Sequence, residues 1–341
     1  MENIRLSALS PIMKKMTSDS LVTLDELKAA QRRIAGVAVH TSLVPIASSD
    51  IAGEAFIKVE AEQPIGSFKL RGAYNKIAQL TEDQRRRGVI TYSSGNHAQG
   101  VAYAARAVGA KAVIVMPSNA PEVKKQATAA LGAEIVEVGP ASSDRKLKAE
   151  ELEAKFGYVM IPPYDDPQII AGQGTCGLEI LEDLPDVDLI LAPVSGGGLL
   201  SGVAAAVKHL RPEVRVLGIE PELAGDAQES FRGGKLVSWP AEMTTRTIAD
   251  GLRTQSLGDL NFLHVRAFVD DILTVTEEQI KEAMRFMVHT AKLTPEPSGA
   301  VTTAGLLFHQ SDLLPYRKVV AIMSGGNVEP KVLQSVLGES S

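Results

Sequence analysis

The sequence has 341 residues, 45% hydrophobic and 22% charged, which is the balance of a globular protein with room for two domains. The net charge is −6 and the longest basic run is Arg85–Arg87, which argues against a nucleic-acid binder. The single cysteine, Cys176, excludes an intrachain disulfide and a cysteine-based metal site, and we expect it to be a buried packing residue. Because the start does not resemble a signal peptide and no run of about 18 apolar residues occurs, we expect a cytoplasmic protein without a membrane partner.

The predicted elements alternate between short apolar strands and helices. The pattern Thr23-x-x-Glu26 predicts a capped helix that includes "LKAAQRRIAG" (27–36). Further along, the apolar pattern predicts strands at 88–93, 110–117, 133–139, 188–195, 214–221 and 317–326, and helices at 97–109, 122–132, 144–157 and 198–211. This alternation predicts an α/β fold in which helices cover both faces of a parallel sheet. Since no low-complexity linker is present, we expect any second domain to be an insertion.

Three of the predicted strand ends are rich in Gly, Ser and Asn. They are "SSGNH" (93–97), "SGGGLLSG" (195–202) and "SGGN" (324–327). Ligands of open α/β sheets bind where strands end and helices begin, so the three together indicate a ligand site. In the second stretch three glycines open a helix, where successive backbone N–H groups can bind a phosphate. This stretch matches neither the Walker pattern nor the dinucleotide fingerprint.

Lys69 lies in "QPIGSFKLRG" (63–72), between a glycine-serine turn and an arginine. It could be an ordinary surface lysine. In a partly apolar pocket, however, desolvation would lower its pKa and make the amine a nucleophile. A reactive amine combined with a phosphate cradle suggests pyridoxal phosphate, which has an aldehyde for the amine and a phosphate for the backbone donors.

The chain resembles the pyridoxal-phosphate enzymes of fold type II, in the family of serine/threonine dehydratases and serine racemases. Six motifs in order carry the resemblance: "GSFKLRGA" (66–73), "SSGNHAQGVA" (93–102), "GQGTCGLEI" (172–180), "PVSGGGLLSG" (193–202), "TIADGL" (247–252) and "SGGNV" (324–328). It implies a fold like that of the tryptophan synthase β subunit, with two doubly wound parallel-sheet domains, the smaller inserted in the larger. The large cofactor-binding domain would comprise 1–75 and 164–341, and the small mobile domain 76–163 would close over the substrate. The family also suggests a homodimer or a higher homo-oligomer.

The resemblance implies a role for each matching residue at the cofactor. Lys69 would form a Schiff base with pyridoxal phosphate, Phe68 would pack against its ring, and Asn96 would hydrogen-bond the ring oxygen. The phosphate would be bound by Ser195, Gly196, Gly197, Gly198 and Leu199. The family usually has glycine at position 195, and serine keeps the backbone donor provided that its φ is not strongly positive. Ser324 would face the pyridine nitrogen and leave it largely neutral, which suits reactions in which a β-substituent leaves promptly.

The loop after the first of these strand ends would bind the substrate. By the resemblance it consists of Ser93, Ser94, Gly95, Asn96 and His97. Ser94 would lie across the cofactor from the lysine, and in racemases this serine exchanges the α-proton on the opposite face. Dehydratases of the family also carry a serine here, so Ser94 permits racemisation without demonstrating it. We expect His97 to be a helix-start residue rather than a general base.

A further likeness concerns a cation site. Glu220 and Asp226, with the Ala224 carbonyl between them, resemble the divalent-cation site of the family. Oxygen ligands of this kind suit Mg²⁺, Mn²⁺ or Ca²⁺. Carboxylates in such loops are, however, often merely solvated.

The expected function is a dehydratase, or ammonia-lyase, that converts a β-hydroxy amino acid into a 2-oxo acid and ammonia. Threonine and serine are the first substrates to consider, with hydroxyaspartate and phenylserine left open because Ile65 replaces a more usual threonine. The alternative is an amino-acid racemase on the same scaffold, followed by a binding protein without turnover and a β-replacement enzyme. Because the sequence ends at residue 341, we expect no C-terminal regulatory domain.

Overall fold

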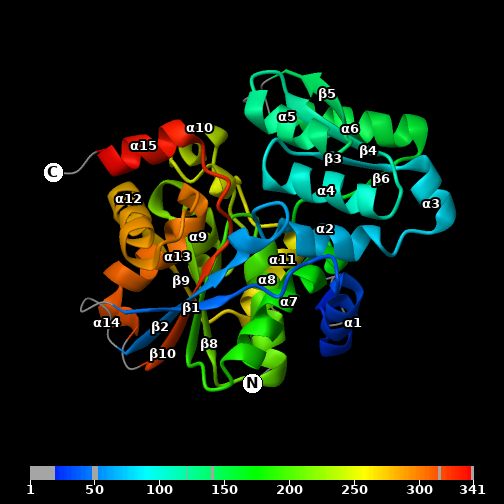
Figure 1. Cartoon of the computed structure of the whole chain (residues 1–341). Coiled ribbons are helices and arrows are strands. Elements are labelled where there is room, and N and C mark those ends of the chain that lie inside the picture. The colour runs from blue at the N-terminus through cyan, green and yellow to red at the C-terminus, as the bar shows by residue number, and fades with distance from the viewer. Residues whose placement is uncertain (1–19, 48–52, 121, 140–141, 314–315, 339–341) are drawn as a thin grey trace.

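The computed structural model describes residues 20–47, 53–120, 122–139, 142–313 and 316–338, and its strands form two sheets (Figure 1). The six-stranded sheet has the order β1-β2-β10-β7-β8-β9. Its strands are β1 (Leu43–Ile46), β2 (Glu54–Val59), β10 (Lys318–Met323), β7 (Leu189–Pro193), β8 (Arg215–Pro221) and β9 (Asp271–Val275). All neighbours are parallel except β1, which pairs antiparallel with β2 at the edge. The predicted parallel sheet is therefore mixed at this edge.

The second sheet has four parallel strands in the order β5-β4-β3-β6. These are β3 (Val89–Tyr92), β4 (Ala112–Pro117), β5 (Glu134–Val138) and β6 (Val159–Met160). Four helices belong to the same part of the chain: α3 (Glu82–Arg87), α4 (Asn96–Ala107), α5 (Glu122–Ala130) and α6 (Ser142–Phe156). They form the separate cyan and green lobe in Figure 1. Since this lobe lies between β2 and β7 in chain order, it is inserted in the larger one, as predicted.

The remaining helices surround the six-stranded sheet. They are α1 (Leu24–Ile34), α2 (Lys69–Ile77), α7 (Pro167–Asp183), α8 (Gly198–Leu210), α9 (Asp226–Gly233), α10 (Ala241–Thr244), α11 (Asp259–Phe268), α12 (Glu277–Phe286), α13 (Pro297–Phe308), α14 (Gln310–Leu313) and α15 (Pro330–Gly338). Short helical turns occur at η3 (Glu60–Glu62), η4 (Glu222–Ala224), η5 (Asp250–Leu252) and η6 (Met287–Ala291). The predicted first helix begins at a capping box, in which Thr23 and Glu26 bond each other's backbone N–H.

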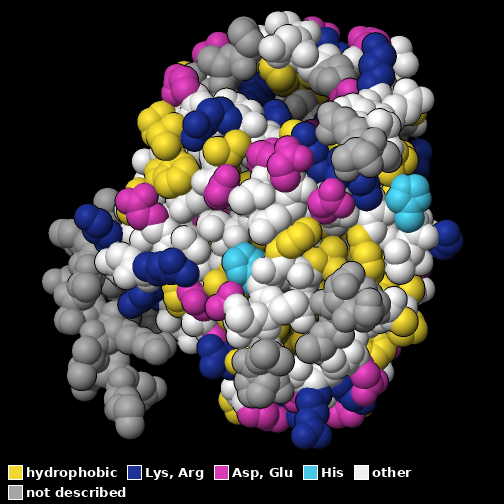
Figure 2. Space-filling model, turned by 90° about the vertical axis from the view of Figure 1, so that its left-hand side faces the viewer, with side chains coloured by type: hydrophobic (Ala, Val, Ile, Leu, Met, Phe, Trp, Pro, Cys, Tyr) yellow, Lys and Arg dark blue, Asp and Glu magenta, His cyan; other side chains and the backbone are white. Residues whose placement is uncertain are grey.

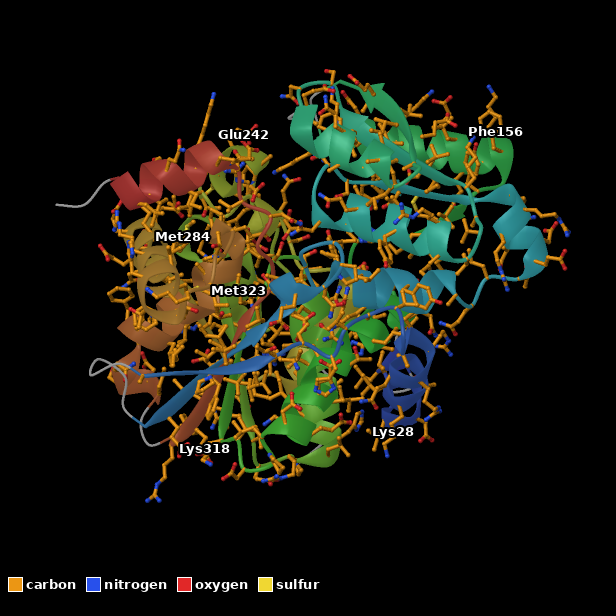
Figure 3. All side chains as sticks on the ribbon, in the orientation of Figure 1. Lys28, Phe156, Glu242, Met284, Lys318 and Met323 are labelled. Atoms are coloured by element: carbon orange, nitrogen blue, oxygen red, sulfur yellow. The ribbon has the colours of Figure 1, made fainter. Side chains whose placement is uncertain are left out.

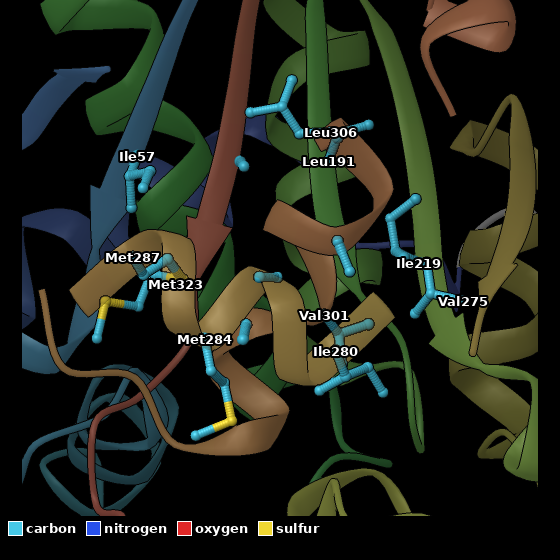
Figure 4. Packing of buried hydrophobic residues seen from close by; sticks show 14 of the residues in the cluster. Ile57, Leu191, Ile219, Val275, Ile280, Met284, Met287, Val301, Leu306 and Met323 are labelled. Atoms are coloured by element: carbon cyan, nitrogen blue, oxygen red, sulfur yellow. The ribbon is translucent and has the colours of Figure 1, made fainter. Parts of the chain in front are cut away.

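The strand β7 shows how the sheet is covered on both faces. Leu189 and Leu191 belong to a buried apolar cluster that includes residues of α12 and α13, and Figure 4 shows Leu191 beside Leu306 of α13. The intervening residues of β7 pack instead with α8. Because successive side chains of a strand point to opposite faces, a strand with helices on both sides must be apolar at every position. This explains why the continuous run "LILAP" predicted a strand.

The surface carries no large patch of one charge on the face that Figure 2 shows, where acidic and basic side chains are interspersed. Among the described residues, no helix combines the length and the apolar character needed to cross a membrane.

Candidate active site

Lys69 and Ser324 are brought together because the start of α2 is bonded to the end of β10. The N–H of Phe68 donates to the Ser324 carbonyl at 3.1 Å, and the N–H of Gly326 donates to the Gly66 carbonyl at 3.0 Å. Met323, labelled in Figure 3, is the last residue of β10 and marks this place. Two of the predicted motifs, "GSFKLRGA" and "SGGNV", therefore form one surface.

The amine of Lys69 is half-buried. Its Nζ donates to the Pro163 carbonyl at 2.9 Å and lies 5.0 Å from the centre of the Phe68 ring. Burial lowers the pKa of Lys69 to about 8, although the charge of Glu296 acts in the opposite direction. Because the neutral amine is the nucleophilic form, this environment supports the predicted role of Lys69.

Arg71, two residues further along α2, anchors this helix through a buried ionic network. Its guanidinium donates to the Glu60 carboxylate at 2.7 Å and to Glu179 at 2.6 and 2.8 Å. Lys58 pairs with Glu179 at 2.9 Å. The side chains of Arg71, Lys58 and Glu60 are fully buried. Since paired buried charges are bound to defined partners, the network holds the helix that begins at Lys69 in a single position.

The glycine-rich loop between β7 and α8 contains unpaired backbone donors. Within the described part of the chain, the N–H groups of Gly196, Gly198 and Leu199 make no hydrogen bond. The ring of Tyr164 packs directly on Gly196, where any side chain would collide with it. Free N–H groups at a helix N-terminus are the expected partners of a phosphate.

The backbone of Ser195 has a positive φ angle, which we did not expect. Its φ is +57°, in the left-handed region, whereas we expected serine to replace glycine here only if φ were not strongly positive. For a non-glycine residue this conformation costs about 1–2 kcal/mol. The Ser195 hydroxyl lies 3.1 Å from Thr254 Oγ1 and donates to the Gly251 carbonyl at 3.3 Å, which holds the residue in place.

The predicted substrate loop connects β3 to α4. The N–H of Gly95 bonds the Ser93 hydroxyl at 3.3 Å, and α4 begins at Asn96. Ser94 is half-buried, and among the described residues it has no hydrogen-bond partner. The helix α4 runs directly against α2, since a Cβ on Gly100 would lie 3.2 Å from the Lys69 carbonyl oxygen. The loop therefore lies beside the helix that carries Lys69.

His97 is buried, and its Nε2 donates to the Ile161 carbonyl at 3.0 Å. Burial, with a contribution from the charge of Lys69, lowers the pKa of His97 to about 3. A histidine with so low a pKa is neutral and only weakly basic. This agrees with the expectation that His97 starts a helix and is not a general base.

Asn96 contacts two side chains of the larger lobe. Its Nδ2 donates to Glu296 Oε1 at 2.8 Å, and its Oδ1 accepts from Asn327 Nδ2 at 2.7 Å. Glu296 is buried, and burial together with the charge of Asp250 raises its pKa to about 8. Asn96 therefore joins the two lobes at the site.

Ser324 is buried, and within the described residues its hydroxyl makes one long hydrogen bond, to the Ser298 carbonyl at 3.5 Å. A hydroxyl held so weakly can bond another group. The groups at this site together fit pyridoxal phosphate. The half-buried amine suits its aldehyde, and the free N–H groups of the glycine loop suit its phosphate. The Ser324 hydroxyl suits the ring nitrogen, and the remaining N–H of Asn96 suits the ring oxygen.

Glu220 and Asp226 come close together at the end of β8 and the start of α9. Both are buried, and burial followed by the charge of Asp226 raises the pKa of Glu220 well above its usual value. Glu220 Oε1 accepts from the Gln228 N–H at 2.7 Å, whereas Asp226 Oδ2 is buried without a partner. Within the described residues, no group of three or more His, Cys, Asp or Glu side chains could hold a metal ion. The predicted cation site has only two such side chains, Glu220 and Asp226, and its third ligand would be the Ala224 carbonyl.

Comparison with known proteins identifies the family. The model of the family described as "Pyridoxal-phosphate dependent enzyme" matches residues 36–325. The chain belongs to this family. It is 41% identical over 94% of its length to L-threonine ammonia-lyase of Thermotoga maritima, of which it covers 79%. It is 40% identical over 92% of its length to serine racemase of Schizosaccharomyces pombe, covering 97% of that protein.

A solved structure shows the same fold. Threonine deaminase of T.th. is 44% identical and matches with a TM-score of 0.85, over 90% of this chain and 99% of that one. The predicted family and fold type II are therefore confirmed. The predicted class of enzyme, a pyridoxal-phosphate dependent lyase, agrees with the relatives, and the racemase remains the alternative.

Two side chains at the site were not singled out from the sequence. Asn327 lies within the quoted "SGGN" motif, so its position was visible although no role was given to it. Glu296 lies between two prolines in "PEPSG" and follows no motif. Only its burial beside Asn96 and Lys69 reveals it.

Proposed function

We propose that this pyridoxal-phosphate enzyme is an ammonia-lyase, or dehydratase, for a β-hydroxy amino acid such as threonine or serine. The observation that carries the proposal is the half-buried Lys69 amine, with a pKa of about 8, which bonds the Pro163 carbonyl next to Tyr164, the residue that packs on the loop of free N–H donors. The relative from Thermotoga maritima, named L-threonine ammonia-lyase, supports the reaction class. When bound, pyridoxal phosphate supplies an electron-accepting ring that makes the α-proton of an amino acid acidic.

Different residues of the chain would bind different parts of pyridoxal phosphate. The N–H groups of Gly196, Gly198 and Leu199 would hold the phosphate, with Ser195 and Gly197 completing the loop. Phe68 would pack on the ring, and Asn96 would donate to the ring oxygen. Lys69 is the base that takes the α-proton, since its lowered pKa makes a neutral amine accessible near neutral pH.

Ser324 bears on the type of reaction. A carboxylate beside the pyridine nitrogen would keep it protonated, whereas a hydroxyl leaves it largely neutral and weakens the electron sink. Prompt loss of a β-hydroxyl is favoured under these conditions. The net reaction breaks the α C–H and β C–O bonds and releases water, and water is taken up again when the resulting imine hydrolyses to a 2-oxo acid and ammonia.

The second candidate is an amino-acid racemase, and Ser94 is the observation in its favour. Its hydroxyl has no partner among the described residues, and in a racemase it would return a proton to the face opposite Lys69. The relative named serine racemase supports this possibility. The loop residues Ser93, Gly95 and His97 would bind the substrate in either case.

Glu220, Ala224 and Asp226 would bind a divalent cation, Mg²⁺, Mn²⁺ or Ca²⁺. The support is the buried, unpartnered Asp226 Oδ2 beside a second buried carboxyl. A cation would neutralise two carboxylates that burial makes costly to ionise. The site lies at the end of a strand next to β7, so the cation would stabilise the edge of the sheet that carries the phosphate loop.

Residues 76–163 would act as a small mobile domain that closes over the substrate, with 1–75 and 164–341 as the large domain. The support is that all four strands of the smaller sheet fall within the first of these ranges. Closure would keep water away from the bound substrate. We further propose a cytoplasmic homodimer or higher homo-oligomer.

The test is a product assay with L-threonine, L-serine, threo-3-hydroxyaspartate and phenylserine, in which 2-oxo acid and the chirality of the remaining amino acid are both measured. Rapid formation of 2-oxo acid, lost in Lys69→Ala, is expected. Exchange of enantiomers with little 2-oxo acid would contradict the lyase and establish the racemase. Activity that survives in Lys69→Ala would overturn the role of the lysine.

A further inference from the structure

The carboxamide of Asn96 is fixed in one orientation by a chain of hydrogen bonds. Asn327 Nδ2 donates to the Ile65 backbone carbonyl at 2.8 Å. A carbonyl can only accept, so the amide group of Asn327 must place its nitrogen there. The same nitrogen lies 2.7 Å from Asn96 Oδ1, and its second proton is used in that bond. The oxygen of Asn96 must therefore face Asn327.

The nitrogen of Asn96 consequently faces Glu296. One of its two protons is donated to Glu296 Oε1 at 2.8 Å. The other proton has no acceptor among the described residues. Glu296 accepts this bond whether or not it is protonated, because the carbonyl oxygen of a neutral carboxyl is still an acceptor.

The carboxyl of Glu296 lies against Gly325, the residue after Ser324, which has no side chain. A Cβ on Gly325 would lie 2.7 Å from Glu296 Oε1, so a side chain there would displace the carboxyl. The N–H of Glu296 also donates to the Gly325 carbonyl at 3.2 Å. One glycine of the "SGGN" motif is therefore required by Glu296.

We propose that Glu296 and Asn327 are positioning residues that present the free N–H of Asn96 to the ring oxygen of pyridoxal phosphate. This inference rests on the contact between Asn96 and the cofactor in the proposed function. Asn96 belongs to the smaller lobe, and the other two residues belong to the larger one. Lys124 of α5 pairs with Asp250 of the larger lobe at 2.8 Å, beside the same junction. The amide is thus oriented only while the lobes are in contact.

The experiment compares variants of the purified holoenzyme by two readouts, the absorbance spectrum of the bound cofactor and its dissociation constant after removal and titration. Glu296→Leu and Asn327→Ala each remove one hydrogen bond to Asn96. We expect each to weaken cofactor binding about fivefold, the equivalent of one hydrogen bond, and to shift the spectrum as Asn96→Ala does. Glu296→Gln keeps an acceptor oxygen and should retain the wild-type spectrum.

Two controls separate positioning from general destabilisation. Glu277→Leu removes a carboxylate that accepts from the Ile248 N–H at 2.6 Å at the start of α12, and it should leave the spectrum unchanged. In the Asn96→Ala background, Asn327→Ala should have no further effect on the cofactor, because it acts through Asn96.

The outcomes are distinguishable. If Asn96→Ala leaves the spectrum and the dissociation constant unchanged, the proposed contact of Asn96 is wrong and the inference is overturned with it. If Asn96→Ala changes both but Glu296→Leu and Asn327→Ala do not, the inference alone is overturned. Additive effects of Asn327→Ala and Asn96→Ala would equally contradict it.

Discussion

The lowered pKa of Lys69 predicts unusual reactivity of its amine in the protein freed of pyridoxal phosphate. With a pKa of about 8, about 9% of the amine is neutral at pH 7. An ordinary lysine with a pKa of about 10.5 has about 0.03% in this form. At equal accessibility and equal nucleophilicity of the neutral amine, Lys69 should therefore react with an acylating reagent about 300-fold faster at pH 7 than the ordinary lysine.

The assay is trace labelling with acetic anhydride between pH 6 and pH 11, with each lysine quantified by mass spectrometry. The labelling of Lys69 should reach half of its maximum near pH 8, and the exposed Lys28 (Figure 3) serves as the internal reference. Because the charge of Glu296 raises the pKa of Lys69, Glu296→Gln should move the midpoint to a lower pH. Labelling of Lys69 that continues to rise in parallel with Lys28 up to pH 11 would refute the reasoning.

Three further predictions concern stability. Burial raises the pKa of Asp226 to about 7, so in a chelator the contribution of this residue to stability should fall as pH rises from about 4 to about 7. Mg²⁺ should therefore raise the melting temperature more at pH 8 than at pH 5, and equal effects at both pH values would contradict the cation site. Burial lowers the pKa of His264 to about 4, so the stability of the wild type relative to His264→Gln should fall by about 2 kcal/mol from pH 7 to pH 5 in denaturant titrations, and a difference between the two proteins that does not change with pH would speak against it. Replacing Arg71 with Met removes the only guanidinium that bonds the buried Glu60 carboxylate in the described network and one of the two cations paired with Glu179, and should cost about 3–5 kcal/mol in urea unfolding, whereas a loss under about 1 kcal/mol would show that the network is dispensable.

Much of the fold could be predicted from the sequence because its signals are local. The run "LILAP" of β7 and the small-residue helix after it are recognisable from neighbouring residues alone, and so is the capping box at Thr23. The strands β1, β2, β6 and β9 were missed. The strands β2 and β9 are at least as long as β7, but in each a charged residue opens the run, so they lack the continuous apolar pattern of β7.

By itself the sequence determined the alternation of strands and helices, the motifs at the strand ends and the chemistry that those motifs support. Such features depend on residues within a few positions of each other. Only the tertiary structure decided that Ser195 adopts a left-handed backbone and that Glu296 meets Asn96, a residue 200 positions away. The physical reason is that a hydrogen bond between distant segments requires the whole sheet to place them, and no local pattern encodes that distance. The lowered pKa of Lys69 likewise follows from burial, which the fold creates.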